Sequence, residues 1–388
     1  MAADRMARAR ETIEDLHEEE IGSDRLRLRL LEAEQHANLD QYDAALAAAA
    51  EVVEKASRIE RWDLAAAAQL CIARIQQQRA PNSAQSTPQI AEAARLFRLA
   101  GDPVGELETE WMTVIARLGE NQWPIGEGAA LAEGAAALND PARAGSWFSI
   151  LAFYAAMAGQ PDKARDYIAS AKPLLAQAGV RSTTFLVIAE SLLEMASDKL
   201  GAAAQRLRDA IAAEEHEGFS TLFLQRSLAI CLMRSGGLIE ADTVLESALK
   251  RSEESGELWN RCELFAKRGV VAVRRGDLQA AEGYVRRSLE TALPNDVSGA
   301  VESNWALAEL RAAEGRDDDA EAAYRRIMAL SAEYYDVLEQ VELSFAGFLV
   351  TRGRGDEAKP MLDRAEAWLD AAGYRVDRDE IAKLRQRI

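Results

Sequence analysis

Histidines are the side chains that most often bind metals or act as general bases, and this 388-residue sequence has three, His17, His36 and His216. They lie far apart, and none has a second histidine four residues away, as a zinc-protease helix requires. Each lies in a polar stretch with helical composition. We therefore expect three surface histidines and no metal site.

Cysteines are the other candidates for metal binding or nucleophilic chemistry. Cys71, Cys231 and Cys262 contain no C-x-x-C pair, and their number is odd. Metal sites and disulfide frameworks usually show paired spacing. Free thiols are typical of a reducing compartment, so we expect a cytoplasmic protein without disulfides.

Two further patterns resemble sites in composition only. The segment RGRGDEAKP at 352–360 has glycines and a lysine, but its spacing is not that of a phosphate-binding loop and no strand precedes it. The acidic run Asp317, Asp318 and Asp319 begins a helical stretch, where carboxylates complement the helix dipole. Because no nucleophile is paired with a base, we expect a non-enzymatic protein without a cofactor.

The charge of the chain opposes two classes of partner. The formal net charge is −18 at pH 7. Nucleic-acid phosphates and anionic membranes attract proteins of the opposite sign, so we expect no direct nucleic-acid binding. No apolar run approaches the ~18 residues that cross a bilayer, and the charged start MAADRMARARETIEDLHEEE lacks a secretory-signal pattern. We therefore expect no membrane insertion.

The elements that carry these residues are predicted to be helices. The sequence is rich in alanine, has only nine prolines and lacks alternating runs of β-branched residues. A glycine-like turn followed five residues later by a small residue recurs at intervals of 38 to 40 residues. The pairs are Gly159–Ala164, Asp198–Ala203, Gly236–Ala241, Gly276–Ala281, Gly315–Ala320 and Gly353–Ala358. Such self-similarity is typical of a helical repeat array.

Each unit repeats a pattern of small, large and small residues at 0, +4 and +7 from this anchor. The large residues are Ile168, Leu207, Leu245, Val285, Tyr324 and Leu362. These three positions share one helical face, so neighbouring helices can approach closely. A period near 39 holds two helices and two turns. We predict a glycine C-cap on the first helix and an N-cap from Asp277 or Asp317 on the second.

The period extends less regularly toward the N-terminus, through Gly126, Ala91 and Ala45. The predicted organisation is an N-terminal capping helix (1–24), one array of about nine hairpins (25–375) with a long polar loop near 76–88, and a C-terminal capping helix (376–388). Asp377 and Glu380 have the spacing of a capping box for this last helix.

These residues resemble the tetratricopeptide repeat family of helix-turn-helix units over roughly residues 25–375. The first helix of several units contributes a large residue followed by alanine at the family's paired position: Leu151-Ala152, Leu228-Ala229, Leu307-Ala308 and Phe345-Ala346. The units are longer than the family's usual ~34 residues and resemble the repeat modules of large bacterial regulators and adaptor proteins. The resemblance implies an all-α, right-handed superhelical solenoid.

In this family the first helices line a concave groove, which implies a set of partner-binding residues here. The set is Trp111, Phe153, Phe185, Met195, Phe223, Arg226, Met233, Arg234, Lys267, Arg274 and Trp305. Aromatic and methionine surface with a cationic strip suits an extended peptide or a partner helix. The alternative interpretation is that the apolar members belong to the core and that the arginines pair with neighbouring glutamates.

Two functional hypotheses follow from the fold and the groove. The first is an adaptor or scaffold that holds a protein or peptide partner. The second is a regulatory sensor whose array changes pitch on binding a peptide or small ligand and controls a separate ATPase or transcription factor. The sequence leaves the partner's identity and a homo-oligomeric state open.

Overall fold

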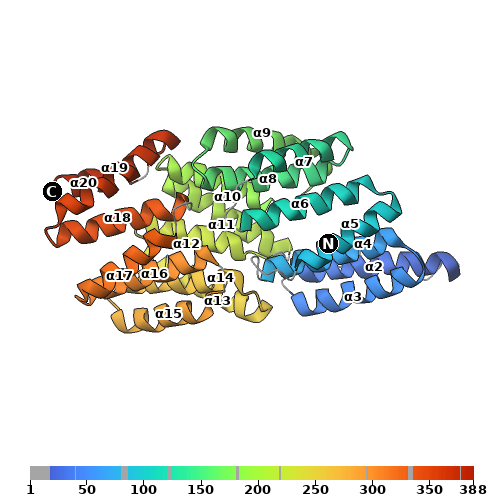
Figure 1. Ribbon diagram of the computed structural model, residues 1–388, viewed down its shortest axis with the longest axis horizontal. Helices are drawn as coiled ribbons and strands as arrows, with labels where there is room; N and C mark the ends of the chain where they lie inside the picture. Colours follow the sequence, from blue (N-terminus) through green and yellow to red (C-terminus); the bar gives the residue numbers. More distant parts are fainter. Residues whose placement is uncertain are drawn as a thin grey trace. The chain divides into compact units, whose positions relative to one another are not determined.

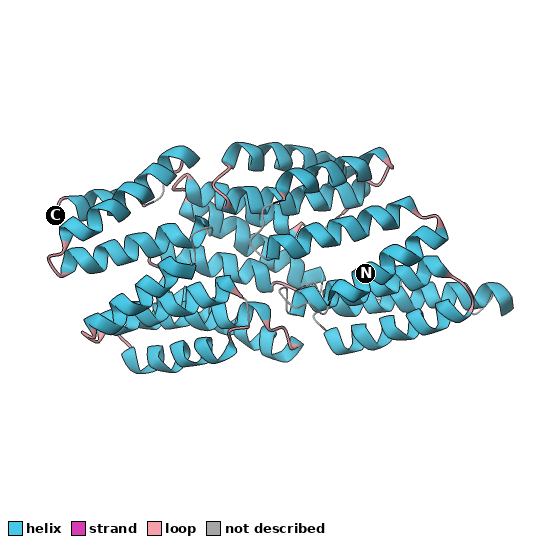
Figure 2. Cartoon of the chain, viewed as in Figure 1, coloured by secondary structure: helices cyan, strands magenta, loops and turns pink. Residues whose placement is uncertain are grey.

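Helices form every regular element that the structure describes. The computed structural model describes residues 18–39, 41–79, 86–119, 124–180, 183–217, 220–293, 296–330, 335–375 and 377–388. Within these ranges there are nineteen helices and no strands (Figure 2). The predicted all-α fold is confirmed. Residues 1–17 of the predicted N-terminal capping helix lie outside the described ranges, and the predicted domain bounds stay predictions.

The chain forms two compact units, and each is described by itself. Unit 1 comprises Met1–Asp140, Ala213–Ser220 and Glu253–Glu257. Its helices are α2 (Glu18–Asn38), α3 (Tyr42–Arg58), α4 (Trp62–Arg79), α5 (Ser86–Ala100), α6 (Pro103–Gly119) and α7 (Ile125–Ala137). Alanines of α3 and α4, together with larger residues such as Val52, Ile75 and Phe97, fill a core between α2 and α6.

Unit 2 comprises Pro141–Ala212, Thr221–Ser252 and Leu258–Ile388, so the last residues of α11 and α13 belong to unit 1. Its helices α8 to α14 are α8 (Pro141–Met157), α9 (Pro161–Ala178), α10 (Thr184–Ala196), α11 (Leu200–Glu217), α12 (Leu222–Arg234), α13 (Leu238–Ser255) and α14 (Trp259–Arg274). The remaining helices are α15 (Leu278–Thr291), α16 (Val297–Ala313), α17 (Asp317–Leu330), α18 (Tyr335–Thr351), α19 (Gly355–Ala372) and α20 (Arg378–Arg385).

Helices of unit 2 pack in two ways. Helix α8 packs against the following helix α9, and α14, α16 and α18 pack likewise against α15, α17 and α19 (Figure 1). The first helices of successive hairpins also pack on one another, α8 with α10, α10 with α12, and α14 with α16. A single hairpin cannot bury its own apolar face, and this stacking buries it.

Left-handed turns join the two helices of each hairpin in unit 2, as predicted. The φ angles are 65° at Gly159, 60° at Asp198, 79° at Gly236, 80° at Gly276, 74° at Gly315 and 71° at Gly353. In the α14–α15 turn, the amide of Asp277 donates to the carbonyl of Ala272 at 2.9 Å, which satisfies a carbonyl at the end of the first helix. Glycine adopts this conformation without a Cβ clash.

The predicted seam of small and large residues is buried. All six anchor alanines have no exposed surface, and the large residues at +4 are at most 8% exposed. Burying a side chain of leucine size contributes about 1.5–3 kcal/mol, and the alanines allow the helices to approach closely. The alanines of the four large-alanine pairs in the first helices are also fully buried.

The N-terminal continuation of the repeat is corrected by the structure. Ala45 is fully buried, but Ala91 and Gly126 are exposed. The buried small residues are Ala93 and Gly128, two positions further along. The buried small residues Ala45, Ala93, Gly128 and Ala164 are 48, 35 and 36 residues apart, so an interval of 38 to 40 residues misplaces the anchors.

The predicted polar loop at 76–88 is too long. Helix α4 continues to Arg79 and α5 begins at Ser86, while residues 80–85 lie outside the described ranges. The glutamine-rich run at 76–78 has high helix propensity, and Gln77 is buried with its side-chain amide directed at the carbonyl of Met112.

Of the N-terminal helix caps predicted at Asp277, Asp317 and Asp377, one forms. The carboxylate of Asp277 accepts from the amide of Ala280 at the start of α15. Asp317 instead lies inside α17 and binds Arg352 at 2.7 Å. The capping box of α20 is also absent, because Asp377 has a φ of 61° and makes no side-chain cap bond.

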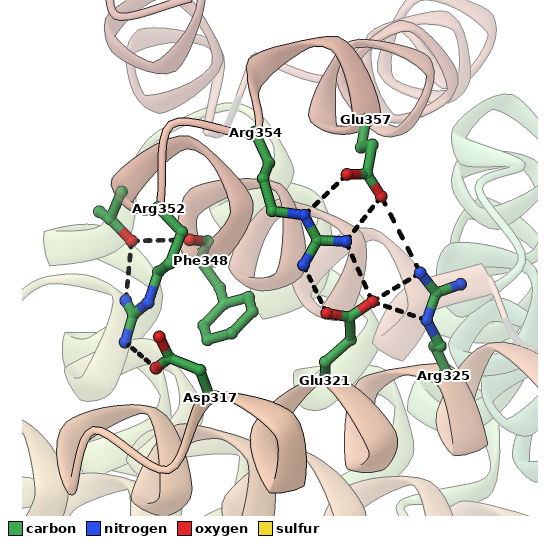
Figure 3. A network of polar contacts seen from close by, with 8 residues as sticks. Asp317, Glu321, Arg325, Phe348, Arg352, Arg354 and Glu357 are labelled. Carbon is green, nitrogen blue, oxygen red and sulfur yellow. Dashed lines mark hydrogen bonds and ion pairs between the residues drawn. The ribbon is translucent and has the colours of Figure 1, made fainter.

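Ion pairs connect consecutive hairpins at the C-terminal end of unit 2 (Figure 3). Arg354, the N-cap residue of α19, binds Glu321 of α17 and Glu357 of its own helix. Arg325 also binds Glu321 at 2.6 Å. The hydrogen bond from Arg354, opposed by partial burial and reinforced by Arg325, lowers the pKa of Glu321 to about 2. Glu321 is therefore ionised at neutral pH.

Candidate partner-binding face

Three phenylalanines of the predicted groove form a continuous row across unit 2. Phe153, Phe185 and Phe223 come from the successive first helices α8, α10 and α12. Their ring centroids are 5.6 Å apart between Phe153 and Phe185 and 5.8 Å apart between Phe185 and Phe223. The rings are tilted, which suits their quadrupoles. Each phenylalanine is half-buried; we call these three residues the aromatic row.

Tyr154 extends the row on α8. Its ring meets that of Phe153 edge to face, with centroids 5.0 Å apart. Burial raises the pKa of Tyr154 to about 12, and the nearby guanidinium of Arg226 opposes that rise. The phenol therefore remains neutral, and it is a hydrogen-bond donor and acceptor at one end of an apolar surface.

Two of the predicted cations belong to ion pairs that link the first helices α12, α14 and α16. Nη2 of Arg226 lies 2.5 Å from Oε2 of Glu263, and Nζ of Lys267 lies 2.5 Å from Oε1 of Glu302. Glu263 is 3% exposed, and Lys267 and Glu302 are each 4% exposed by side chain. We call these four residues the ionic cluster. Charges this deeply buried require partners.

The surroundings set the protonation of both carboxylates in the ionic cluster. Burial works against ionisation of Glu263, but Arg226 and Lys267 outweigh it and lower the pKa of this carboxyl. Oγ of Ser298 also donates to Glu263 at 2.6 Å. At Glu302 burial dominates over the charge of Lys267 and raises the pKa. The cations of the cluster therefore favour the ionised form of Glu263, whereas burial favours the protonated form of Glu302.

A third buried carboxyl, that of Asp296, lies beside the ionic cluster. Oδ1 of Asp296 accepts from the amide of Gly299 at 3.0 Å and caps α16. Burial, followed by the negative charge of Glu263, raises the pKa of Asp296 to about 6. Sγ of Cys262 lies 3.9 Å from its Oδ2. Asp296 thus titrates close to neutral pH.

The other two predicted cations also have partners within unit 2. The guanidinium carbon of Arg274 lies 5.9 Å from the ring centroid of Trp305, and its Nη1 donates to the carbonyl of Met233 at 3.4 Å. Arg234 lies 3.4 Å from Asp377. The alternative interpretation, that the arginines pair with neighbouring glutamates, thus describes Arg226. Arg234 pairs with an aspartate instead, and Lys267 pairs with a glutamate.

The remaining predicted groove residues lie in the cores. Met195, Met233 and Trp305 are 3%, 7% and 3% exposed in unit 2, and the indole of Trp305 donates to Oγ of Ser344 at 3.2 Å. Trp111 is buried in α6 of unit 1. The structure therefore brings together the aromatic row and Arg226, while these four residues serve as packing. A partner-binding role for the predicted set stays a prediction.

Sequence reasoning missed the acidic half of the ionic cluster, although a signal was present. Glu263 and Glu302 are 39 residues apart, one repeat period, so they occupy equivalent positions on α14 and α16. A glutamate that recurs on the buried face of consecutive first helices indicates a buried partner, because an isolated buried carboxylate is costly.

The side chains suited to metal binding are not assembled into a site in the part of the chain that the structure describes. No group of three or more histidine, cysteine or acidic side chains there could hold a metal ion. His216 is exposed, and Nδ1 of His36 contacts Oε1 of Gln41 at 2.6 Å; His17 lies outside the described residues. The three cysteines are free and buried, and burial raises the pKa of each thiol.

Among the described helices, none combines the length and the apolar composition needed to cross a membrane.

Comparisons with known proteins give structural matches alone. No family model matches the chain, and no curated protein matches its sequence. A Rap protein complexed with competence and sporulation factor matches with a TM-score of 0.62 at 12% identity, over 94% of this chain and 100% of that chain. The apo form of RapI matches with a TM-score of 0.53 at 13% identity, over 89% of this chain and 98% of that chain.

A human IFIT1 dimer with m7Gppp-AAAA matches with a TM-score of 0.53 at 14% identity, over 100% of this chain and 85% of that chain. All three are TPR-type repeat proteins, and identities this low show the fold alone. The chain therefore has the all-α helical-repeat fold of the tetratricopeptide-repeat proteins.

Proposed function

We propose that this protein is a non-enzymatic adaptor that binds an extended peptide or a partner helix across the first helices of unit 2. The aromatic row carries the proposal. Three half-buried rings on consecutive first helices form one apolar surface that is still partly open to water. Apolar anchors of a partner would bury the rest of each ring, at about 25 cal/mol per Å².

The ionic cluster determines how that partner is recognised. Arg226 lies three residues after Phe223 on α12, but its charge is matched by Glu263. The local charge is therefore neutral at this end of the aromatic row, and apolar and aromatic contacts dominate recognition. The predicted cationic strip is thereby reduced to Arg274, whose side chain lies by Trp305. A partner with apolar anchors suits this surface better than a strongly acidic one.

The structural matches give this proposal its context. The Rap protein that this chain resembles was solved in complex with competence and sporulation factor, so one protein of this fold binds such a factor. The IFIT1 structure contains m7Gppp-AAAA, so the fold also accommodates capped RNA. The net charge of −18 opposes the second ligand class for this chain.

Peptide display with the purified chain tests the proposal. Peptides selected from a random library would be measured by fluorescence anisotropy against the wild type and Phe185→Ala. We expect binding at least 10-fold weaker in the variant, because Phe185 touches both other rings of the row. Leu289→Ala is the matched control, since Leu289 is a 43% exposed apolar side chain on a second helix, α15.

Thermal unfolding by circular dichroism establishes that both variants are folded at the assay temperature. Selected peptides that bind Phe185→Ala as tightly as the wild type would rule out the aromatic row as the binding surface. If Leu289→Ala weakened peptide binding as much as Phe185→Ala does, the effect of Phe185→Ala would not be specific to the aromatic row.

The second candidate function is a regulatory sensor that controls a separate ATPase or transcription factor. One observation favours it: the phenol of Tyr374, after the last hairpin, donates to the carbonyl of Ala156 in the first helix of unit 2, 218 residues away. Because this hydrogen bond joins the last hairpin to the first, forming or breaking it would change the curvature of the array.

A further inference from the structure

The segment that follows α19 contacts the C-terminal ends of two first helices far earlier in unit 2. Oη of Tyr374 donates to the carbonyl oxygen of Ala156 in α8 at 2.8 Å. The amide of Arg375 donates to the carbonyl oxygen of Ala196, the last residue of α10, at 2.7 Å. The carbonyls at a helix C-terminus lack a partner four residues further along their own helix. The Arg375 amide satisfies the carbonyl of Ala196, and the phenol of Tyr374 is a second donor to the carbonyl of Ala156, which also accepts from the amide of Gly159 at 3.2 Å.

Two side chains add to these backbone contacts. A Cβ atom placed on Gly159, in the α8–α9 turn, would lie 3.0 Å from the ring of Trp368. That ring in turn meets Tyr374 edge to face, with centroids 5.4 Å apart. Asp377 lies 3.4 Å from Arg234, the last residue of α12. The same short segment thus reaches α8, α10 and α12.

We call Trp368, Tyr374, Arg375 and Asp377 the latch. It connects the last hairpin of unit 2 to the first three, which a simple linear stack would not require, since each repeat of such a stack touches only its neighbours. In an open stack, small rotations between hairpins add freely along the array. With the ends joined, those rotations must sum to a fixed value.

We propose that the latch is a conformational switch: closed, it fixes the curvature of unit 2 and the spacing of α8, α10 and α12, and its release lets the array change pitch. Its contacts with α8, α10 and α12 include two hydrogen bonds, one partly exposed ion pair and one ring packed on a glycine. Opening this local set of contacts requires less free energy than global unfolding. This inference concerns the chain alone and does not rest on the proposed function.

Hydrogen exchange tests the switch without any ligand. The double variant Tyr374→Phe/Asp377→Asn removes the phenol donor and the carboxylate charge. It keeps the ring that packs on Trp368, and asparagine tolerates the left-handed backbone at position 377. We expect the Arg375 amide to exchange at least 10-fold faster than in the wild type, while amides of α14 keep their wild-type rates.

The matched control is Tyr284→Phe/Asp379→Asn. It removes the same two chemical groups from the half-buried Tyr284 of α15 and from the exposed Asp379 of α20, outside the latch. We expect wild-type exchange at Arg375 in this control. Equal exchange at Arg375 in the two double variants would overturn the proposal, and so would a uniform acceleration that includes α14, because that outcome reports global destabilisation.

Spin labels measure whether opening changes the array. Labels at Lys199→Cys and Lys383→Cys occupy exposed positions at the start of α11 and on α20, and the three native cysteines are buried. We expect a longer and broader distance distribution in the latch variant than in the wild type. A narrow, unchanged distribution in the variant would show that the latch does not control curvature.

A measurement on the wild-type protein tests the switch even if the double variant misfolds. At 1 M salt the Debye length falls to about 3 Å, which weakens the exposed part of the Arg234–Asp377 pair. We expect faster exchange at Arg375 in wild-type protein at high salt, with α14 unchanged. Identical exchange at low and high salt, together with wild-type exchange in the single variant Tyr374→Phe, would contradict the switch.

Discussion

Arg226 and Glu263 form an ion pair that links the first helices of two consecutive hairpins, with Nη2 and Oε2 2.5 Å apart and the carboxylate side chain 3% exposed. Removing Arg226 leaves Glu263 buried without its ion-pair partner, with Lys267 as the other nearby cation. We expect Arg226→Gln to lower the free energy of unfolding by about 3 kcal/mol, measured by urea denaturation. Charge reversal at this position would therefore test stability rather than partner binding.

The exposed pair Arg286–Glu290 is the control for the Arg226 prediction. Both of its side chains are well exposed, at 70% and 64%, so Arg286→Gln should change stability by less than about 0.5 kcal/mol. The combined variant Arg226→Met/Glu263→Gln should recover part of the loss, since no unmatched charge remains. Equal stabilities of Arg226→Gln and the wild type would contradict the buried pair.

Asp198 has the left-handed backbone that glycine has in the other five hairpin turns of unit 2, with a φ of 60°. A side chain in this conformation is strained, although aspartate tolerates it better than most residues. We expect Asp198→Gly to raise the free energy of unfolding by about 0.5–1 kcal/mol. The reciprocal change Gly276→Asp, at a φ of 80°, should lower it. A destabilised Asp198→Gly protein would mean that the aspartate side chain itself holds the turn.

The anchor alanines offer a test with adjacent residues on one helix. Ala203 of α11 is fully buried, whereas Ala202 beside it is exposed. We expect Ala203→Leu to destabilise by about 1–3 kcal/mol through overpacking and Ala202→Leu to change stability by less than about 0.5 kcal/mol. Thermal unfolding of the two variants distinguishes them. Similar melting temperatures of the two variants would show that the helices packed around Ala203 can move apart to accommodate a leucine.

The repeat was predictable from sequence because its determinants are local. A residue such as Gly276 is needed wherever the backbone turns left-handed, and Ala281 is needed wherever two helices approach closely. The same logic failed at Ala91 and Gly126, because the buried small residues are Ala93 and Gly128 and the units there are not 38 to 40 residues long. A fixed interval does not represent units of unequal length.

The candidate face was predictable only in part, for a different reason. Phe185 and Trp305 have the same chemistry and lie on first helices, but one is half-buried and the other is 3% exposed. Apolar side chains serve the core and a ligand surface equally well, so the residue type does not separate them. The latch was not predicted, because its contacts join residues such as Ala156 and Tyr374 across 218 positions of the chain.

Asp296 gives the protein a pH-dependent stability whose sign follows from the raised pKa. Below about pH 4 the carboxyl is protonated in both the folded and the unfolded chain. Between about pH 4 and pH 6 the folded protein retains the proton that the unfolded chain releases, so the free energy of unfolding falls as pH rises. Above about pH 6 the carboxyl is ionised in both states, and the free energy of unfolding no longer changes with pH. The total decrease is about 3 kcal/mol for a pKa raised by roughly two units.

Replacing Asp296 with asparagine should remove that loss. An asparagine oxygen can still accept from the amide of Gly299 and cap α16, but it carries no charge beside Glu263. We expect Asp296→Asn and the wild type to have similar stabilities near pH 3.5 and the variant to be more stable at pH 7.5, by up to about 3 kcal/mol. Asp277→Asn, which changes the exposed N-cap of α15, is the control. Urea denaturation at both pH values measures the difference, and a variant that is less stable than the wild type at pH 7.5 would show that the Asp296 charge is stabilised by its surroundings.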